Sequence, residues 1–540
     1  MTIKRIVEPD DDGNDIVREG EETELEIESN ETEIDRRLLV EQEQHLNLKE
    51  QFAADGNSHN DDNKGEQEQE QKEPEHNEED EERVVTIIEK ITEDILERFR
   101  FLTIEESREI LIYDKGVYAK GGEVLIEKNA ELLYGYELAN RHLAEIKGHI
   151  MRKTFHKREE LDADVNIINL KNGLYNIETG EFKEHTPDYL SITQKPIIYD
   201  PNARPKLFGK YLQQVLYPTE IRTAIEVMAY TLYKDNPYEI MVKLFGYGAN
   251  GKSVFTGLLT ALHGPQNVSN VPLTAMLKNR FALSDLENNY INIDNELSSA
   301  TIHDTTVLKK LTGRQPVRIE RKNQRAYDTT LYAKLIFSAN KIPETQDESD
   351  AYFRREIIIG FPRRFEDGKG ADPNLLRKMT TEEELSGIFN VLVPALKRVL
   401  YNGIFVREKT IEQRRERHQL AVDPIASFLK EAIAEHSEES DKTFKDILYR
   451  AYKQFCKEHE LAVESEENFA KILKSDRFRN QDGRETTGKR RRFWKGIKLA
   501  EKYDKEEEQQ TLEDIVAEVK APVPMPMPSM PSPSRVFEKP

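Results

Sequence analysis

The feature that most constrains the fold of this chain is a glycine-rich loop at residues 246–253, which reads Gly-Tyr-Gly-Ala-Asn-Gly-Lys-Ser. An apolar run at 240–245 precedes the loop, and a helical pattern at 254–263 follows it and stops at Gly264-Pro265. A strand, a glycine-rich turn and a helix in this order match the phosphate-binding loop G-x-x-x-x-G-K-[ST]. The sequence therefore predicts an α/β nucleotide-binding core around this loop.

Each residue type in the loop has a physical reason to be there. The glycines let successive backbone N–H groups point inward around a phosphate chain, and the start of the helix adds a positive dipole end. Lys252 is expected to reach the terminal phosphates of ATP, and the Ser253 hydroxyl is expected to bind Mg²⁺. The predicted nucleotide-binding residues are Gly246, Gly248, Ala249, Asn250, Gly251, Lys252 and Ser253.

The formal net charge of -22 is concentrated at the N-terminus. Residues 1–84 hold 30 Asp and Glu against 9 Lys and Arg, whereas the rest of the chain holds 71 acids and 70 bases. So polar a segment cannot bury enough apolar surface to fold, and 1–84 is expected to be a disordered acidic tail. A solubilising role is favoured there over a docking motif. The nearly neutral remainder of the chain can carry local basic patches.

Cysteine content and hydropathy bear on the compartment. Cys456 is the only cysteine, which excludes a disulfide or a cysteine zinc site within one chain and fits a reducing environment. No run of about eighteen apolar residues exists, and the N-terminus lacks the pattern of a signal peptide. The expectation is a soluble cytoplasmic protein without a membrane partner, in the host cytoplasm if the protein is viral.

Composition and periodicity divide the 540 residues into about three folded domains and two tails. Residues 85–235 mix helical patterns with hairpin signals, one at 111–118 and one around Asn172-Gly173, and predict an α+β domain. Residues 236–405 hold the nucleotide core, and 423–500 form a third unit. Residues 501–540 are an acidic and Pro-rich tail, for which a flexible end is favoured over a partner ligand.

The third unit predicts three helices, at 424–436, 443–459 and 465–475, followed by a β-hairpin around Asp482-Gly483. This is the layout of a winged helix. A basic run lies in the expected wing and indicates contact with duplex or forked DNA, although a nuclear-localisation signal is a weaker alternative. The DNA-binding candidates in this run are Lys489, Arg490 and Arg491.

Two strands after the loop end in polar residues that suit ATP hydrolysis. The strand at 290–296 ends in acids, of which we assign Asp294 to Mg²⁺ and Glu296 to the activation of water. The strand at 331–340 ends in Asn340, whose amide is placed to hold the attacking water or to sense the γ-phosphate. Either strand alone is also compatible with an ordinary polar strand end.

Arg354 and Arg355 follow Phe353 and precede an apolar strand. An arginine here could enter the site of a neighbouring subunit and stabilise charge in the transition state, which requires a ring or a dimer. Taken on its own, the pair would be better explained as two surface arginines that flank a strand. An Asp-x-Asp pair at 162–164 could hold metals in a polymerase, but the acidic tail stands where the rest of such a domain would be, so a solvated turn is favoured.

Together these segments resemble the superfamily 3 helicases, the compact AAA+-like ring motors of viruses and plasmids. The loop at 246–253, the acidic strand at 291–296 and the strand at 335–340 match the first three motifs of that family in order. The phrases around 308–318, 337–343 and 353–362 are similar to its phage/plasmid and poxvirus-type primase–helicase group, and the resemblance covers roughly residues 90–500. Arg314-Gln315 stand where that group usually has an acid. No polymerising primase domain fits upstream, so priming is not expected.

The resemblance implies an AAA+-like P-loop NTPase core, an α+β N-terminal domain, a C-terminal winged helix, ATP and Mg²⁺ as ligands, and a homo-hexamer. In this family a β-hairpin before the sensor strand projects into the ring channel, and the matching segment here, 317–327, is basic. Cations at a hairpin tip grip phosphates without reading sequence. The hairpin candidates are Arg318, Arg321, Lys322, Asn323 and Arg325.

The leading hypothesis is an ATP-dependent replicative DNA helicase of a virus or plasmid that translocates on single-stranded or forked DNA. Other replication proteins could bind through the tails. The alternative is an ATP-dependent origin-binding initiator that does not unwind processively. A packaging or remodelling motor is disfavoured because the acidic strand, sensor and arginines lie so close together.

Overall fold

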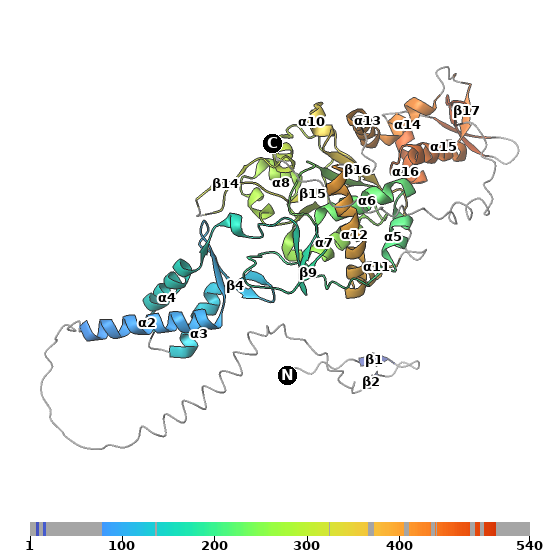
Figure 1. The fold of residues 1–540 in the computed structure, drawn as a ribbon. Helices are drawn as coiled ribbons and strands as arrows, with labels where there is room; N and C mark the ends of the chain where they lie inside the picture. Colours follow the sequence, from blue (N-terminus) through green and yellow to red (C-terminus); the bar gives the residue numbers. More distant parts are fainter. Residues whose placement is uncertain are drawn as a thin grey trace, which may run out of the picture. The chain divides into compact units, whose positions relative to one another are not determined.

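The computed structural model describes most of the chain from residue 78 to residue 503 (Figure 1). The chain divides into two units, Met1–Glu78 and Glu79–Pro540. In the first unit, β1 (Val7–Pro9) pairs antiparallel with β2 (Asp15–Val17). Among the described residues no helix combines the length and apolar character that a membrane span needs. The described ranges are 7–9, 15–17, 78–134, 138–322, 325–365, 372–403, 405, 410–433, 438, 440–475, 481–485 and 491–503.

Most residues of the two tails that we expect to be disordered or flexible lie outside the described residues. Helix α2 (Glu78–Arg98) begins inside the predicted N-terminal tail, so the boundary at residue 84 is wrong by about two helical turns. The helix continues the pattern that buries Ile88, Ile91 and Ile95 on one face.

Helix α2 packs against a four-stranded sheet with the strand order β5-β4-β3-β6. The elements are β3 (Phe101–Ile104), β4 (Ile110–Asp114), β5 (Val117–Lys120), α3 (Gly122–Tyr134), α4 (Asn140–Lys153) and β6 (Phe155–His156). The expected hairpin at 111–118 is present as the antiparallel pair of β4 and β5. Helices α3 and α4 share the apolar core of α2 through Ile126, Ile146 and Ile150.

A second, three-stranded sheet leads into two helices beside the nucleotide core. The elements are η2 (Arg158–Glu160), β7 (Ile167–Leu170), β8 (Gly173–Asn176), β9 (Phe182–Lys183), α5 (Phe208–Val215) and α6 (Pro218–Thr231). The predicted hairpin around Asn172-Gly173 is confirmed by the antiparallel pairing of β7 and β8. A Cβ at Gly173 would lie 2.4 Å from the Lys183 carbonyl, so only glycine fits there.

The centre of the fold is a five-stranded sheet in the order β11-β12-β15-β10-β16. Its strands are β10 (Met241–Phe245), β11 (Val268–Ser269), β12 (Ile291–Asp294), β15 (Lys334–Ala339) and β16 (Glu356–Gly360). All of its neighbouring strands are parallel, so the strands are buried on both faces and read as nearly continuous apolar runs. Phe245 pairs with both Ala339 and Gly360, so the carboxyl ends of β15, β10 and β16 finish at one edge. The fold is therefore mixed α/β around a parallel sheet.

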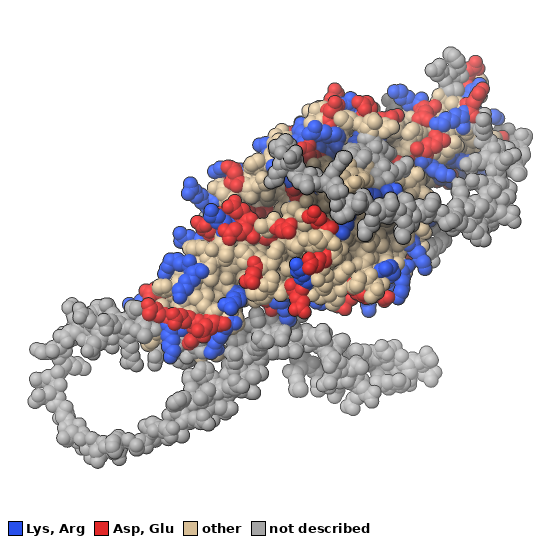
Figure 2. Space-filling model, viewed as in Figure 1, with Lys and Arg blue, Asp and Glu red and all other residues tan. Residues whose placement is uncertain are grey.

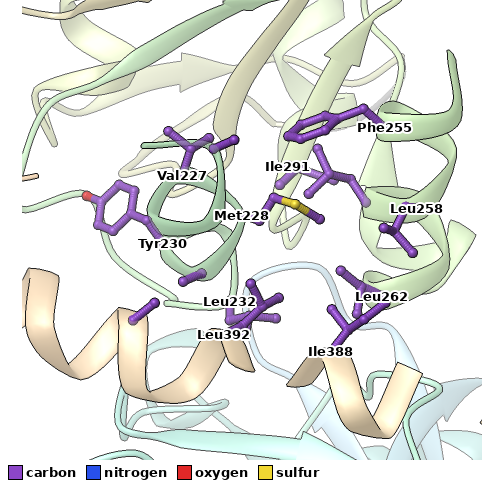
Figure 3. Packing of buried hydrophobic residues seen from close by; sticks show 14 of the residues in the cluster. Val227, Met228, Tyr230, Leu232, Phe255, Leu258, Leu262, Ile291, Ile388 and Leu392 are labelled. Atoms are coloured by element: carbon purple, nitrogen blue, oxygen red, sulfur yellow. The ribbon is translucent and has the colours of Figure 1, made fainter. Parts of the chain in front are cut away.

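Helices cover this sheet and join it to the preceding region. They are α7 (Lys252–His263), α8 (Leu273–Lys278), α9 (Thr306–Thr312), α10 (Asp350–Phe353), α11 (Leu375–Met379) and α12 (Glu382–Asn402), with short turns η3 (Pro265–Asn267) and η4 (Ala282–Leu286). Figure 3 shows Met228 of α6, Leu258 and Leu262 of α7, and Leu392 of α12 converging on one core. Each such buried side chain stabilises the fold by about 1.5–3 kcal/mol.

Helix α13 (Ile411–Val422), which the sequence did not predict, is fixed to the sheet by a buried charge network. Glu356 accepts from Lys243 at 2.5 Å, and His418 Nδ1 lies 2.9 Å from the same carboxylate. Despite the opposing effect of burial, these two neighbours lower the pKa of Glu356 to about 2. The network ties α13 to the starts of β10 and β16.

The C-terminal unit has the three predicted helices and an antiparallel sheet in the order β17-β19-β18. Its elements are α14 (Pro424–Ala432), β17 (Lys442–Phe444), α15 (Lys445–Glu458), α16 (Glu466–Lys474), β18 (Asp482–Arg484) and β19 (Arg492–Lys495). The helix expected from residue 443 instead begins at Lys445, because Thr443 and Phe444 pair with β19. A strand partner fifty residues away overrides the local helical pattern.

Candidate functional site

The glycine-rich loop joins the end of β10 to the start of α7. Gly248, Ala249 and Gly251 have φ values of 91°, 45° and 91°, a region that favours glycine and lets backbone N–H groups converge. A Cβ at Gly251 would lie 2.7 Å from Cγ1 of Val215. A Cβ added at Gly248 would have no atom of the described residues within 4 Å, so the loop is open there. The loop has the form of a backbone cradle for an anion.

Lys252 is buried at the first turn of α7 among neutral oxygens. Its ammonium donates to the Gly246 carbonyl, to Oδ1 of Asn340 at 3.1 Å and to Oδ1 of Asn250 at 3.3 Å. Burial lowers the pKa of Lys252 to about 8. The Asn250 Nδ2 is also buried, without a hydrogen-bond partner among the described residues. A buried ammonium with only neutral acceptors and a buried amide donor without an acceptor fit a phosphate chain, which would supply acceptors and negative charge.

Two flanking regions hold the loop in place. The Tyr211 hydroxyl of α5 donates to the Gly251 carbonyl at 2.9 Å. On the other side, Tyr247 packs against the apolar cluster that the central sheet shares with the C-terminal helices. The sequence motif did not predict either contact, because each contact joins segments that are distant in the chain.

The predicted acids lie past β12, at the same edge of the sheet. Asp294 is buried, and its carboxylate accepts from the backbone N–H groups of Leu273 at 2.9 Å and Glu296 at 3.2 Å. Each oxygen keeps a lone pair, so the assignment of Asp294 to Mg²⁺ stays a proposal. Glu296 and Ser253 are exposed. An exposed carboxylate, a buried carboxylate and a hydroxyl are the donor types that Mg²⁺ and a water-activating base require.

Asn340 follows β15, the strand between the loop strand β10 and the acidic strand β12. Its hydrogen bond to Lys252 brings together two predicted residues that are far apart in sequence. Carboxyl ends of parallel strands form the usual ligand site of open α/β sheets. The loop strand, the acidic strand and the strand before Asn340 therefore end at the same edge of the sheet, and the roles assigned to their residues stay a prediction.

The structure separates the roles of the two arginines before β16. The Arg355 side chain is only 6% exposed, and it binds Glu239 at 2.6 Å, Thr312 Oγ1 at 3.0 Å and the Ala351 carbonyl. The Arg354 side chain is 52% exposed and reaches Glu239 at 2.8 Å. Arg354 is therefore the member of the pair that could reach another subunit, and Arg355 braces the fold.

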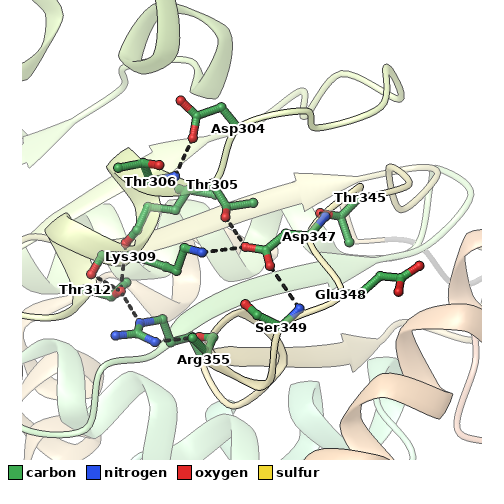
Figure 4. Close-up of polar contacts among 12 residues, drawn as sticks. Asp304, Thr305, Thr306, Lys309, Thr312, Thr345, Asp347, Glu348, Ser349 and Arg355 are labelled. Carbon is green, nitrogen blue, oxygen red and sulfur yellow. Dashed lines mark hydrogen bonds and ion pairs between the residues drawn. The ribbon is translucent and has the colours of Figure 1, made fainter.

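A polar network connects this arginine to the loop after the sensor strand (Figure 4). Asp347 accepts from Lys309 at 2.7 Å and from Thr305, both on or next to α9. Hydrogen bonds from Lys309, Ser349 and Thr305 hold the pKa of Asp347 well below its usual range, against the effect of burial. The other end of α9 presents Thr312 to Arg355. Helix α9 thus joins the segment after Asn340 to the arginine pair.

The predicted hairpin is present as β13 (Val317–Ile319) and β14 (Tyr327–Thr329). Arg318, Lys322 and Arg325 are exposed. Arg321 instead forms an ion pair with the buried Glu287 at 2.6 Å, so in this structure its charge is directed into the protein. Asn323 lies outside the described residues.

Sequence reasoning missed two groups beside this hairpin. Phe281, which follows α8, is 38% exposed and lies 4.7 Å from the Arg280 guanidinium, which in turn reaches Glu320 of the hairpin at 3.3 Å. Glu287 also binds Arg158 at 2.8 Å and so connects the hairpin to the preceding domain. In the sequence, the only signal for the first group was an aromatic residue directly after an arginine.

Some of the basic residues described in the C-terminal unit form ion pairs with acids. Arg491 binds Asp446 at 2.6 Å, and Lys474 binds Asp482 at 3.0 Å. Lys489 and Arg490 lie outside the described residues. On the face seen in Figure 2, Lys and Arg are interspersed with Asp and Glu and do not gather in one continuous patch.

The turn at 162–164 differs from the solvated turn expected there. Asp162 is buried, binds Lys234 at 3.0 Å and accepts from Ser191 Oγ at 2.6 Å and Thr193 Oγ1 at 3.0 Å. Partners on the chain thus occupy both of its oxygens. Asp164 is exposed, and its Oδ1 accepts from a neighbouring backbone N–H. The arrangement is structural and does not resemble a paired metal site.

Two protein families match separate segments of the chain, one before the glycine-rich loop and one that contains it. Residues 72–217 match the family described as D5 N terminal like, and residues 244–355 match a family of unknown function, DUF5906. Two solved structures, the apo structure and the A form apo structure of the NrS-1 C terminal region, are 12% and 11% identical, with TM-scores of 0.39 and 0.38. Each alignment covers 76% of this chain and 98% of the other, a likeness too weak to support an argument about function. Over residues 72–217 the chain is thus similar to the D5 N-terminal-like family, and the loop and sensor strand lie in the separate match that follows.

Proposed function

We propose that this protein is an ATP-dependent replicative DNA helicase of the superfamily 3 type, acting as a hexameric ring on single-stranded or forked DNA. The observation that carries the proposal is the hydrogen bond between Lys252 and Asn340 at the open glycine loop, with Glu296 at the same edge of a parallel sheet. The similarity of residues 72–217 to the D5 N-terminal-like family supports a place among phage-type primase–helicases.

The proposed domains are an α+β domain at 85–235, an AAA+-like motor at 236–405 and a winged helix at 423–500. Bound ATP with Mg²⁺ supplies the phosphoanhydride bond whose hydrolysis drives the motor. Lys252 neutralises phosphate charge, and Ser253 and Asp294 hold the metal.

The remaining residues act on the attacking water and on DNA. Glu296 accepts a proton from the water, and Asn340 orients that water. Arg354 from the adjacent subunit stabilises charge on the transferred group. The exposed cations of the hairpin, above all Lys322, bind the DNA backbone, and Phe281 is placed to stack on a base.

Replacement of Lys252 with Ala tests the proposal on a forked DNA substrate. We expect the wild-type protein to displace the strand only with ATP, and Lys252→Ala to lose at least about a hundredfold in ATPase rate and all displacement. Thermal unfolding should show an intact fold, because the lysine has no carboxylate partner to lose. Lys120→Ala, at an exposed lysine paired with Glu109, is the matched control and should behave like wild type.

Normal displacement by Lys252→Ala would contradict the motor assignment. A wild-type protein that protects a defined duplex sequence in the presence of ATP but never separates strands would instead be an origin-binding initiator. Light scattering with ATP and DNA measures the subunit number, for which we expect six.

A further inference from the structure

A second arginine pair, Arg363-Arg364, lies just beyond the end of β16 and was not assigned any role by the sequence motifs. Strand β16 runs parallel to β10, so the two strands end at the same edge as the nucleotide loop. The pair therefore lies on the nucleotide side of the sheet. The first pair, Arg354-Arg355, lies at the opposite edge, about 17 Å away by the length of a five-residue strand.

Backbone hydrogen bonds anchor the segment carrying the second pair to the nucleotide loop of the same chain. The Phe361 N–H donates to the Phe245 carbonyl at 2.8 Å, immediately before the loop. The Phe365 N–H donates to the Ala249 carbonyl at 2.7 Å, in the middle of the loop. The two arginines are thus held between two fixed points along the loop.

Side-chain packing fixes the two anchors further. Phe361 is buried and its ring packs against Phe255 of α7 at 5.9 Å, and Phe365 packs against the same core. Arg363 and Arg364 are exposed between these anchored rings. Because the residues on both sides of the pair are anchored beside the loop, the long and flexible guanidinium side chains start within reach of its mouth.

The charge balance of the loop makes such a contact useful. A nucleoside triphosphate brings several negative charges, and among the loop residues only Lys252 is cationic. A guanidinium has five donors in a planar fork that matches phosphate oxygens.

We propose that Arg363-Arg364 binds the phosphate chain of the nucleotide held by its own subunit, an inference that rests on the proposed function. The pair is a binding and positioning element in cis, and it is distinct from the arginine supplied by a neighbour. Because the contact depends on phosphate charge, affinity for ATP should depend on the pair more than affinity for AMP does.

The test is equilibrium binding of a fluorescent ATP analogue and the corresponding AMP analogue to the full chain, without DNA. We expect the double variant Arg363→Ala/Arg364→Ala to bind the ATP analogue about 10- to 100-fold more weakly and the AMP analogue within about threefold of wild type. Arg363→Lys/Arg364→Lys keeps the charge and should recover part of the affinity. Arg152→Ala/Lys153→Ala removes an exposed basic pair from the last turn of α4 and is the matched control.

Unchanged ATP affinity in the alanine variant, or an equal loss for both analogues, would overturn the inference. If the alanine variant is misfolded, Arg363→Gln/Arg364→Gln, which keeps polar side chains without the charge, decides. Weaker binding of the ATP analogue with AMP binding kept supports the contact, and unchanged ATP binding opposes it. A wild-type protein that binds ATP through this pair but never displaces a strand would remove the proposed helicase function and leave the inference standing.

Discussion

The two ends of β16 carry the same dipeptide, Arg-Arg, in opposite structural settings. At the start of the strand, Glu239 binds both arginines, and Arg355 is buried while Arg354 reaches solvent. At its end, Arg363 and Arg364 are exposed on a segment anchored to the nucleotide loop. Under the proposed function, strand polarity would direct the second pair to the nucleotide of its own chain and the first pair to a nucleotide bound by another chain.

The largest expected effect is on hydrolysis and comes from Arg354→Ala. We expect the rate of ATP hydrolysis to fall about a thousandfold, because a trans arginine stabilises charge only in the transition state. Binding of the ATP analogue should stay within about twofold of wild type. Steady-state ATPase assays and equilibrium binding on the same preparation separate these two quantities.

Mixed oligomers show whether the arginine acts in trans. Lys252→Ala and Arg354→Ala chains, each inactive alone, should regain ATPase activity when combined, since some interfaces then pair an intact loop with an intact Arg354. The same mixing with Arg363→Ala/Arg364→Ala should give no recovery, because that pair and Lys252 serve one site from one chain. Failure of the first mixture to recover would place Arg354 outside the neighbour's site.

We expect Arg355→Ala to lower the stability of the fold rather than to remove a catalytic group. Its guanidinium is buried against Glu239 and Thr312, and loss of a buried charged hydrogen-bonding group costs about 2–3 kcal/mol of unfolding free energy. Arg354→Ala should cost less than about 1 kcal/mol, since that side chain is half exposed. Urea unfolding of the three proteins measures the difference. Equal stability of Arg354→Ala and Arg355→Ala would contradict the division of roles.

The backbone arrangement around the glycine-rich loop could be predicted from the sequence because its signals are local, whereas the roles of its residues stay a prediction. The order of strand, loop and helix around Lys252, and the polar residues that end β12 and β15, are set by neighbours in the chain. Parallel strands then bring their carboxyl ends together, so Asn340 meets Lys252 without any further signal.

What the sequence could not show depends on contacts between distant segments. The buried partner of Arg321 is Glu287, and the partner of Asp162 is Lys234, so the charges that looked solvated in the sequence are directed inward. Thr443 became a strand because Trp494 pairs with it. Nothing in the local pattern distinguishes Arg354 from Arg355, since only Arg355 also binds Thr312 of α9 and the Ala351 carbonyl.

The smallest expected effect is a pH dependence that separates the lysine of the loop from the arginines beside it. Burial lowers the pKa of Lys252 to about 8 in the free protein, and bound phosphates should raise it, so the charged form binds ATP. Affinity should be nearly full at pH 7 and fall about tenfold between pH 7 and pH 9, where most of the free lysine is neutral. Arginines stay charged throughout this range, so Arg363→Ala/Arg364→Ala should bind more weakly at every pH but keep the same slope. A flat affinity between pH 7 and pH 9.5 would show that Lys252 does not titrate there, and a slope lost in the arginine variant would place the titrating group beside that pair.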